Sequence, residues 1–169
     1  MKKILFLTLF LLAFSGRLFR LGPNIEFVTG AMILATIFLG RKYSIFLVLA
    51  VMISTDLILG NSHIFLFTWT GFLIPALVLK LKKPLMGILA GLGSNAFVFL
   101  WTNFGVWALD SWGMYEKNLG GLISCYINGL PFLKNQIVST LVVIPVGFIV
   151  IKVITKYVKA EDKSYLKAF

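Results

Sequence analysis

The sequence predicts an all-α integral membrane protein with six transmembrane helices and a short helix at its outer face. Three long stretches, residues 57–79, 84–109 and 135–151, carry no charged side chain and are mostly apolar. Such stretches have the length and the hydrophobicity that the hydrocarbon core of a bilayer requires. Only 13% of the 169 residues are charged, whereas a soluble domain carries roughly 25%. We therefore expect one membrane domain over residues 1–169.

The first predicted helix covers about residues 3–18. Lys2 and Lys3 followed by an apolar run are also typical of a secretory signal peptide with a cleavage site. We favour an uncleaved helix, because Arg17 and Arg20 follow at once and the apolar pattern then resumes. Cleavage of this segment stays open as the alternative.

Turn-forming residues divide the rest of the chain. Residues 43–79 contain one charge, Asp56, and as one helix they would be roughly 55 Å long, nearly twice the thickness of the bilayer core. They must fold back, and Gly-Asn-Ser at 60–62 is the natural turn. The remaining predicted spans are 25–39, 43–59, 63–79, 84–103 and 134–156, and the short outer-face helix is 119–132, which is apolar and contains three glycines and Pro131.

The distribution of charge predicts the orientation of these spans. With six crossings, twelve of the sixteen Lys and Arg residues lie on one side, together with two of the six acidic residues. The other side then carries four basic and four acidic residues. Because basic loops stay in the cytoplasm, both termini are predicted to be cytoplasmic. The net charge of +10 is thereby explained by topology, and we expect no binding of nucleic acid.

Asp56 is the most informative single residue. It lies about 12 residues above the inner end of its predicted helix, or roughly 18 Å into a 30 Å slab. A carboxylate at that depth is costly unless it is paired or faces a wet cavity. Arg17 is the natural partner, so we predict an Arg17–Asp56 pair at the floor of an outward-facing cavity. The alternative is a buried ion pair that only fixes the helix register.

The predicted outer loop 103–118 combines aromatic and polar side chains, among them Asn103, Trp107 and Tyr115. Aromatic rings with a few polar groups are typical of a small-molecule pocket. The alternative is an aromatic belt at the membrane interface.

Small residues indicate where helices approach closely. Gly87 and Gly91 form a G-x-x-x-G pattern, and Gly30, Ala31 and Ala35 place small side chains on another predicted helix. These contacts are expected either within the bundle or toward another subunit.

No set of catalytic residues is recognisable in the sequence. It lacks a nucleophile elbow, an H-E-x-x-H motif and a phosphate-binding loop. His63 and Cys125 are the single His and the single Cys, and they lie far apart in the chain. We therefore expect no enzymatic activity, no cofactor and no metal site.

Several segments resemble an uncharacterised bacterial membrane-protein family that is similar to the substrate-binding S components of energy-coupling factor (ECF) transporters. The segments are Arg17 to Asn24, Gly30-Ala31, Asp56 to Gly60, Thr102-Asn103-Phe104-Gly105-Val106-Trp107, Tyr115, Gly121-Leu122, Cys125-Tyr126 and Pro131-Phe132. The resemblance implies an S-component-like six-helix bundle in the bacterial cytoplasmic membrane, which binds a vitamin-like metabolite at its outer face. A transmembrane T component and ATPase subunits would be its partners. The expected ligand-binding residues are Arg17, Asn24, Asp56, Asn103, Trp107, Tyr115 and Tyr126.

Three functions therefore stand beside one another. The first is a membrane-embedded component that binds a small metabolite for uptake. The second is a scaffold or assembly factor without transport activity, and the third is an intramembrane enzyme that acts on lipid. An enclosed cavity beneath loop 103–118 that reaches Asp56 would favour the metabolite-binding component. A filled outer face would favour the scaffold, and a groove open to lipid would favour the enzyme.

Overall fold

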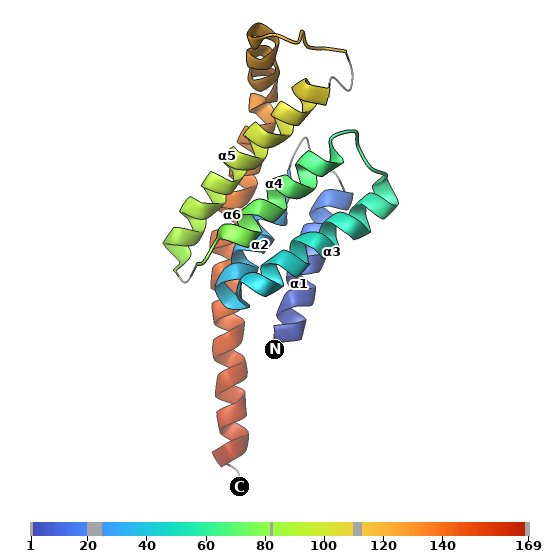
Figure 1. The fold of residues 1–169 in the computed structure, drawn as a ribbon. Helices are drawn as coiled ribbons and strands as arrows, with labels where there is room; N and C mark the ends of the chain where they lie inside the picture. Colours follow the sequence, from blue (N-terminus) through green and yellow to red (C-terminus); the bar gives the residue numbers. More distant parts are fainter. Residues whose placement is uncertain (1, 20–24, 82, 110–112, 168–169) are drawn as a thin grey trace.

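The computed structural model describes residues 2–19, 25–81, 83–109 and 113–167 of the chain. Over these residues the chain forms six α-helices and no β-strand (Figure 1). The helices are α1 Lys2–Leu18, α2 Val28–Phe38, α3 Arg41–Leu59, α4 Phe65–Val78, α5 Pro84–Leu109 and α6 Leu119–Lys167. The start of α1 and the C-terminal part of α6 lie at the same end of the bundle.

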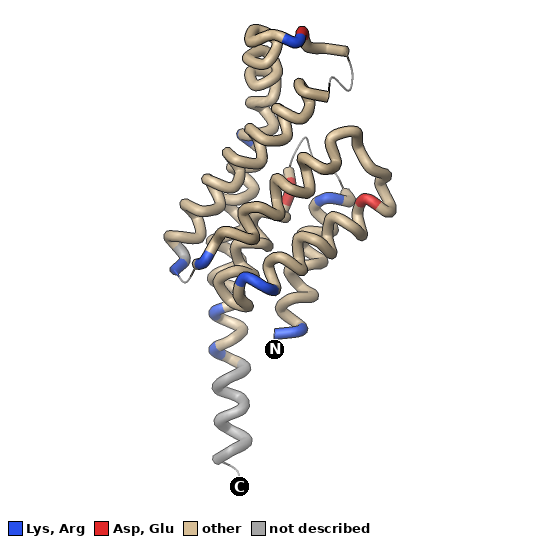
Figure 2. The backbone as a smooth tube through the Cα atoms, in the orientation of Figure 1, with Lys and Arg blue, Asp and Glu red and all other residues tan. Residues whose placement is uncertain are grey.

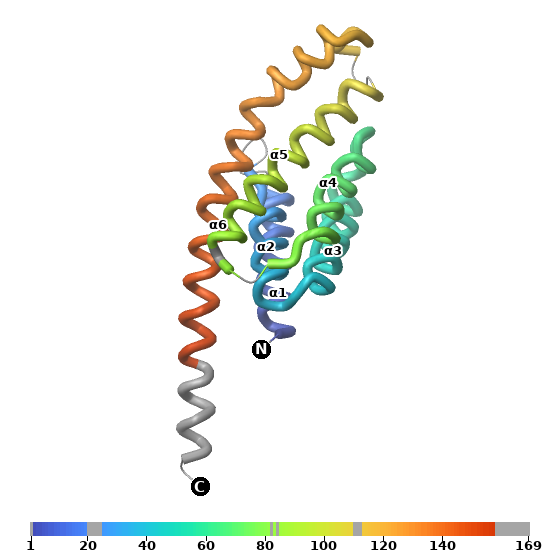
Figure 3. The backbone as a smooth tube through the Cα atoms, turned by 60° about the vertical axis from the view of Figure 1, so that its left-hand side comes forward, coloured from blue at the N-terminus to red at the C-terminus, as the bar shows by residue number. Residues whose placement is uncertain are grey.

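Helix α2 lies at the centre of the bundle and contacts all five other helices (Figure 3). Nine of its eleven residues, 28–36, are buried. A helix that is apolar on all sides is expected in such a position, because no face of it requires water. The other helices are arranged around α2 and form the core with it.

Small residues let the helices approach α2 closely. A Cβ atom added to Gly30 would lie 2.4 Å from Cγ1 of Val143 in α6. A Cβ atom on Gly87 would lie 2.8 Å from Ile37 of α2, and one on Gly91 would lie 2.8 Å from Ile144 of α6. The close contacts predicted from small-residue spacing are thus contacts within the bundle.

The outside of the bundle is apolar. Large hydrophobic side chains are exposed on several helices, for example Ile4 of α1, Phe46 of α3 and Leu89 of α5. Soluble monomers rarely expose contiguous apolar surface of this extent. Within the described residues, three helical segments are long and apolar enough to cross a bilayer: Arg41–Leu59, Leu85–Leu109 and Leu119–Tyr157. These features indicate a membrane protein. Helices α1, α2 and α4 are shorter than these three segments, with 17, 11 and 14 residues.

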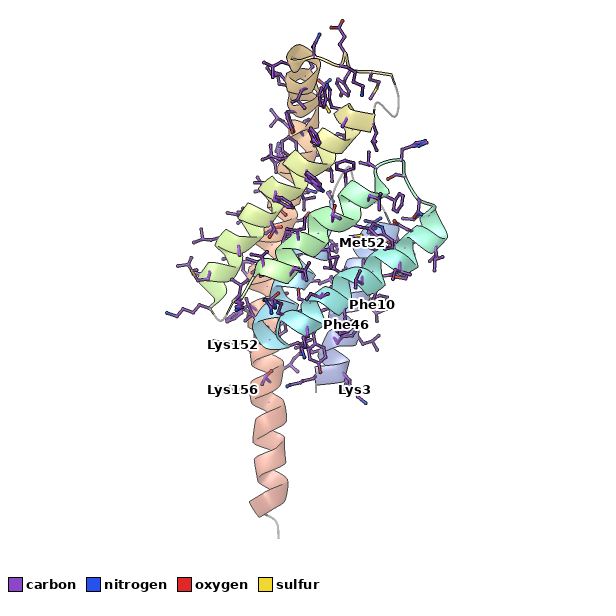
Figure 4. All side chains as sticks on the ribbon, viewed as in Figure 1. Lys3, Phe10, Phe46, Met52, Lys152 and Lys156 are labelled. Carbon is purple, nitrogen blue, oxygen red and sulfur yellow. The ribbon has the colours of Figure 1, made fainter. Side chains whose placement is uncertain are left out.

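Basic side chains gather at one end of the bundle. Figure 2 shows them where α1 begins, at the turns α2–α3 and α4–α5, and on the part of α6 that leaves the bundle. Lys3, Lys152 and Lys156 lie toward this end, whereas Met52 lies farther along the bundle (Figure 4). The segments that the charge pattern assigned to one side of the membrane are therefore together in the fold.

The C-terminal half of the chain differs from the prediction, because residues 119–132 and 134–156 belong to the single helix α6. Glycines that suggested a break are required for packing instead. A Cβ atom on Gly129 would lie 2.6 Å from Oδ1 of Asn103, and one on Gly121 would lie 2.1 Å from the carbonyl oxygen of Glu116. Pro131 lies inside the helix, which continues through it.

Helix α5 also extends farther than predicted, to Leu109 instead of residue 103. The first part of the predicted outer loop is therefore helical, and Asn103 and Trp107 lie on α5. The apolar run continues to Leu109 without a proline or a charged residue, so the helix continues with it. Gly105 serves packing, since a Cβ atom there would lie 2.4 Å from the ring of Phe67 in α4.

Candidate functional site

The predicted pair of Arg17 and Asp56 is confirmed. Nη2 of Arg17 in α1 donates a hydrogen bond to Oδ1 of Asp56 in α3, and the two side chains form a salt bridge. Nε of Arg17 donates to Oγ1 of Thr55 at 2.8 Å, and Nη1 lies 3.0 Å from Sδ of Met52. Each nitrogen of the guanidinium group therefore has a partner on α3.

The second oxygen of the carboxylate binds a residue that sequence reasoning missed. Nε1 of Trp69 in α4 donates to Oδ2 of Asp56 at 2.7 Å. Asp56 is 8% exposed, so its charge is stabilised by these two donors instead of by water. An indole in the middle of a predicted apolar helix was the available signal, because a buried tryptophan N–H requires an acceptor.

A cavity of about 320 Å³, which we call the central cavity, lies beside this pair. All six helices or the segments next to them contribute to its wall. The lining residues are Gly16, Arg17, Ile25, Glu26, Val28, Leu59, Ile64, Thr68, Phe72, Val98, Thr102 and Gln136. A smaller pocket of about 150 Å³ shares Arg17, Leu59 and Thr68 with it and reaches Asp56.

Glu26 brings a second carboxylate to the central cavity. Its Oε2 accepts hydrogen bonds from the backbone N–H groups of Val28 and Thr29, the latter at 3.1 Å. Its Oε1 accepts from the Thr29 hydroxyl at 2.8 Å. The carboxylate thus caps the N-terminus of α2, where the helix dipole favours negative charge. In the sequence, an acidic residue two positions before the start of a helix is the signal for such a cap.

Gln136 of α6 is another residue that the sequence analysis did not identify. It is 4% exposed, and its Oε1 has no hydrogen-bond partner among the described residues. Its backbone oxygen accepts from Nδ2 of Asn95 at 3.1 Å, and the same nitrogen lies 2.8 Å from Oγ1 of Thr140. A buried amide oxygen without a partner is costly. As the one glutamine at the start of a charge-free apolar stretch, Gln136 was recognisable as unusual.

A larger cavity of about 590 Å³ lies beneath the connection between α5 and α6, and we call it the hairpin cavity. Its lining residues are Ile64, Thr102, Asn103, Val106, Met114, Tyr115, Cys125, Asn128, Gly129 and Phe132. It shares Ile64 and Thr102 with the central cavity, so the two cavities adjoin. Asn103 and Tyr115, both predicted site residues, are thereby brought together in one wall.

The two remaining aromatic candidates lie elsewhere. Nε1 of Trp107 donates to the backbone oxygen of Glu116 at 3.0 Å, and the ammonium group of Lys117 lies 5.7 Å from the centre of its ring. The hydroxyl of Tyr126 donates to the backbone oxygen of Leu100 at 3.2 Å. Neither residue lines the central or the hairpin cavity. Asn24 lies outside the described residues.

The charges and dimensions of these cavities suit a small polar molecule with an apolar part. Ligand pockets typically measure about 300–1,000 Å³ and combine an apolar wall with few polar groups. Among the described residues, His, Cys, Asp and Glu form no group of three or more that could hold a metal ion.

Comparison with known protein families identifies the family of this chain. The model of DUF6580, a family of unknown function, matches residues 1–162. The chain belongs to DUF6580. No curated protein and no solved structure matches this DUF6580 chain. Its function must therefore be inferred from its own residues.

Proposed function

We propose that this DUF6580 protein is a membrane-embedded component that binds a small metabolite for uptake, with the ligand in an outward-facing cavity. The observation that carries the proposal is the central cavity, which brings Arg17, Glu26 and Gln136 together between apolar helices. Ionisable and amide side chains are costly at membrane depth and are retained there mainly for function. A purely structural bundle has no need of an open space lined by such groups.

The position of the cavities supports binding over the two other functions. The hairpin cavity lies beneath residues 114 and 115. The small pocket that reaches Asp56 shares residues with the central cavity, which in turn adjoins the hairpin cavity. A scaffold would be expected to have a filled outer face. An enzyme acting on lipid would be expected to have its polar groups in a groove on the lipid side.

We further propose six membrane crossings, with both termini in the cytoplasm and the protein in the bacterial cytoplasmic membrane. The basic end of the bundle would face the cytoplasm, and the cavities would then open outward. Helix α2, with 11 residues, is roughly 17 Å long and shorter than a full crossing. Local thinning of the bilayer and the segments flanking the helix would accommodate it.

Energy for uptake would come from partner proteins. The sequence contains no phosphate-binding loop, so we propose coupling to a T component and ATPase subunits, as the resemblance to ECF S components implies. The partners would contact the membrane-embedded bundle, and the ligand would be released after they engage it.

Mass spectrometry of co-purifying small molecules tests the proposal. The protein is purified in mild detergent, and bound metabolites are compared between wild type, Asp56→Asn and Glu116→Gln. Glu116 lies in the α5–α6 connection and lines neither cavity, so it is a matched acid-to-amide control. We expect one metabolite that is retained by wild type and the control and is lost from Asp56→Asn. A metabolite retained equally by all three proteins would make the Arg17–Asp56 pair structural only.

A further inference from the structure

We infer that the ligand is a small amine, with a protonated N–H donor group in the central cavity and an apolar body in the hairpin cavity. This inference rests on the proposed function and concerns the chemistry of the same site. It follows from which hydrogen-bonding groups of the wall are already in use.

The two hydroxyl groups of the central cavity have committed their hydrogens. Oγ1 of Thr68 donates to the backbone oxygen of Ile64 at 3.3 Å. Oγ1 of Thr102 donates to the backbone oxygen of Val98 at 2.8 Å. Since a hydroxyl has one hydrogen and two acceptor sites, both threonines offer the cavity only acceptors.

The carboxylate and the amide of this cavity add further acceptors. Glu26 receives three hydrogen bonds, which leaves room for about one more on a carboxylate with roughly four acceptor sites. Oε1 of Gln136 has no partner among the described residues. Rotation about the last side-chain bond of glutamine is soft, so this oxygen can turn toward a ligand in the cavity that Gln136 lines.

The charge of the described wall also disfavours an anion. Arg17 already forms a salt bridge with Asp56, whereas Glu26 has no salt-bridge partner among the described residues. A ligand carboxylate would have to share Arg17 with Asp56, so that two carboxylates would meet at one guanidinium group. Like charges brought together away from water are strongly unfavourable. A protonated amine carries the opposite charge, so the same carboxylates attract it.

The hairpin cavity suits the apolar body of such a ligand. Val106, Met114 and Phe132 give it apolar walls, and Met and aromatic side chains adapt well to rings. Nδ2 of Asn103 donates to the backbone oxygen of Phe99 at 2.8 Å, and Oδ1 of Asn103 lies 4.0 Å from Sγ of Cys125, so this oxygen keeps one acceptor site for a ligand in the cavity. Ile64 and Thr102 line both cavities, so a ligand that occupies both would extend past these two residues.

Native mass spectrometry with a matched library tests this inference. Full-length protein in detergent is incubated with an equimolar mixture of arylalkylamines, arylalkanoic acids and arylalkanols that share the same rings and chain lengths. We expect the amines to be enriched about tenfold or more over both other classes. The amine that binds most tightly is then titrated against wild type and variants.

Variants of residues that line the central cavity test whether these residues cause the selectivity for amines. We expect Gln136→Leu to weaken binding of this amine about tenfold, the usual effect of losing one hydrogen bond. Valine resembles threonine in shape, so Thr102→Val provides a second test if Gln136→Leu does not fold. Ser139→Ala is the matched control, because Ser139 is buried one turn away on α6 but lines neither cavity.

The possible results separate the inference from the proposed function. Tighter binding of the acids, equal binding of the alcohols, or unchanged affinity in both Gln136→Leu and Thr102→Val would overturn the inference and leave a small-molecule site in place. Absence of binding by all three classes would also overturn the inference, whereas absence of any co-purifying metabolite would contradict the proposed function itself.

Discussion

Neutralising Asp56 is the most informative single perturbation of the bundle. Asp56→Asn keeps an oxygen for the Trp69 indole but removes the charge that pairs with Arg17. The Arg17 side chain is 21% exposed, so its charge would remain largely buried without a counter-charge. Breaking a buried pair in this way costs about 3–5 kcal/mol. Because Arg17 lines the central cavity, where water can enter, we expect about 3 kcal/mol, at the low end of that range.

A double-mutant cycle isolates the pair from the rest of the site. Arg17→Met in the Asp56→Asn background removes the unpaired charge, and we expect it to restore about half of the lost stability. Unfolding in mixed detergent–SDS micelles, followed by helical circular dichroism, measures each free energy. Losses that simply add in the double variant would show that Arg17 and Asp56 do not stabilise each other, and would refute this reasoning.

Two further predictions concern the glycines. Gly30→Ala should destabilise the bundle by about 1–3 kcal/mol, because its Cβ atom would lie 2.4 Å from Val143. The control Gly93→Ala, whose Cβ atom would have nothing within 4 Å, should leave the melting temperature unchanged or slightly higher. Equal effects of the two substitutions would contradict the packing described for α2. Gly129→Ala should weaken binding of the amine that binds most tightly, because its Cβ atom would lie 2.6 Å from Oδ1 of Asn103 and would disturb the hairpin cavity. Titration of this amine into Gly129→Ala and into the control Gly93→Ala measures the difference. Equal affinities would count against contact of the ligand with this cavity.

The N-terminal half of the fold could be predicted because its signals are local. Clusters of basic residues and the turn at Gly60, which has a positive φ of 78°, separate helices close to their observed ends. The Arg17–Asp56 pair was also predictable. A buried carboxylate requires a cation, and Arg17 was the basic residue expected at a similar depth.

The rest depends on tertiary structure. Gly121, Gly129 and Pro131 resemble helix breakers in the sequence, and only the close approach of Asn103 and Glu116 explains why two of them are glycines inside α6. The cavities likewise form where helices distant in sequence fail to fill the space between them. Glu26 and Gln136 could be noticed as unusual residues, but no sequence pattern places them in one wall.

Cysteine accessibility in intact cells tests the outward-facing cavity most directly. Thr102 lines both cavities, so Thr102→Cys is introduced into a Cys125→Ser background, with Lys80→Cys at the basic end as the control. We expect a membrane-impermeant maleimide to label residue 102 in intact cells, and prior addition of the tightest-binding amine to block that reaction. Residue 80 should react only after permeabilisation. Labelling of residue 102 only in permeabilised cells, or labelling that the bound amine leaves unchanged, would contradict a ligand cavity open to the outside.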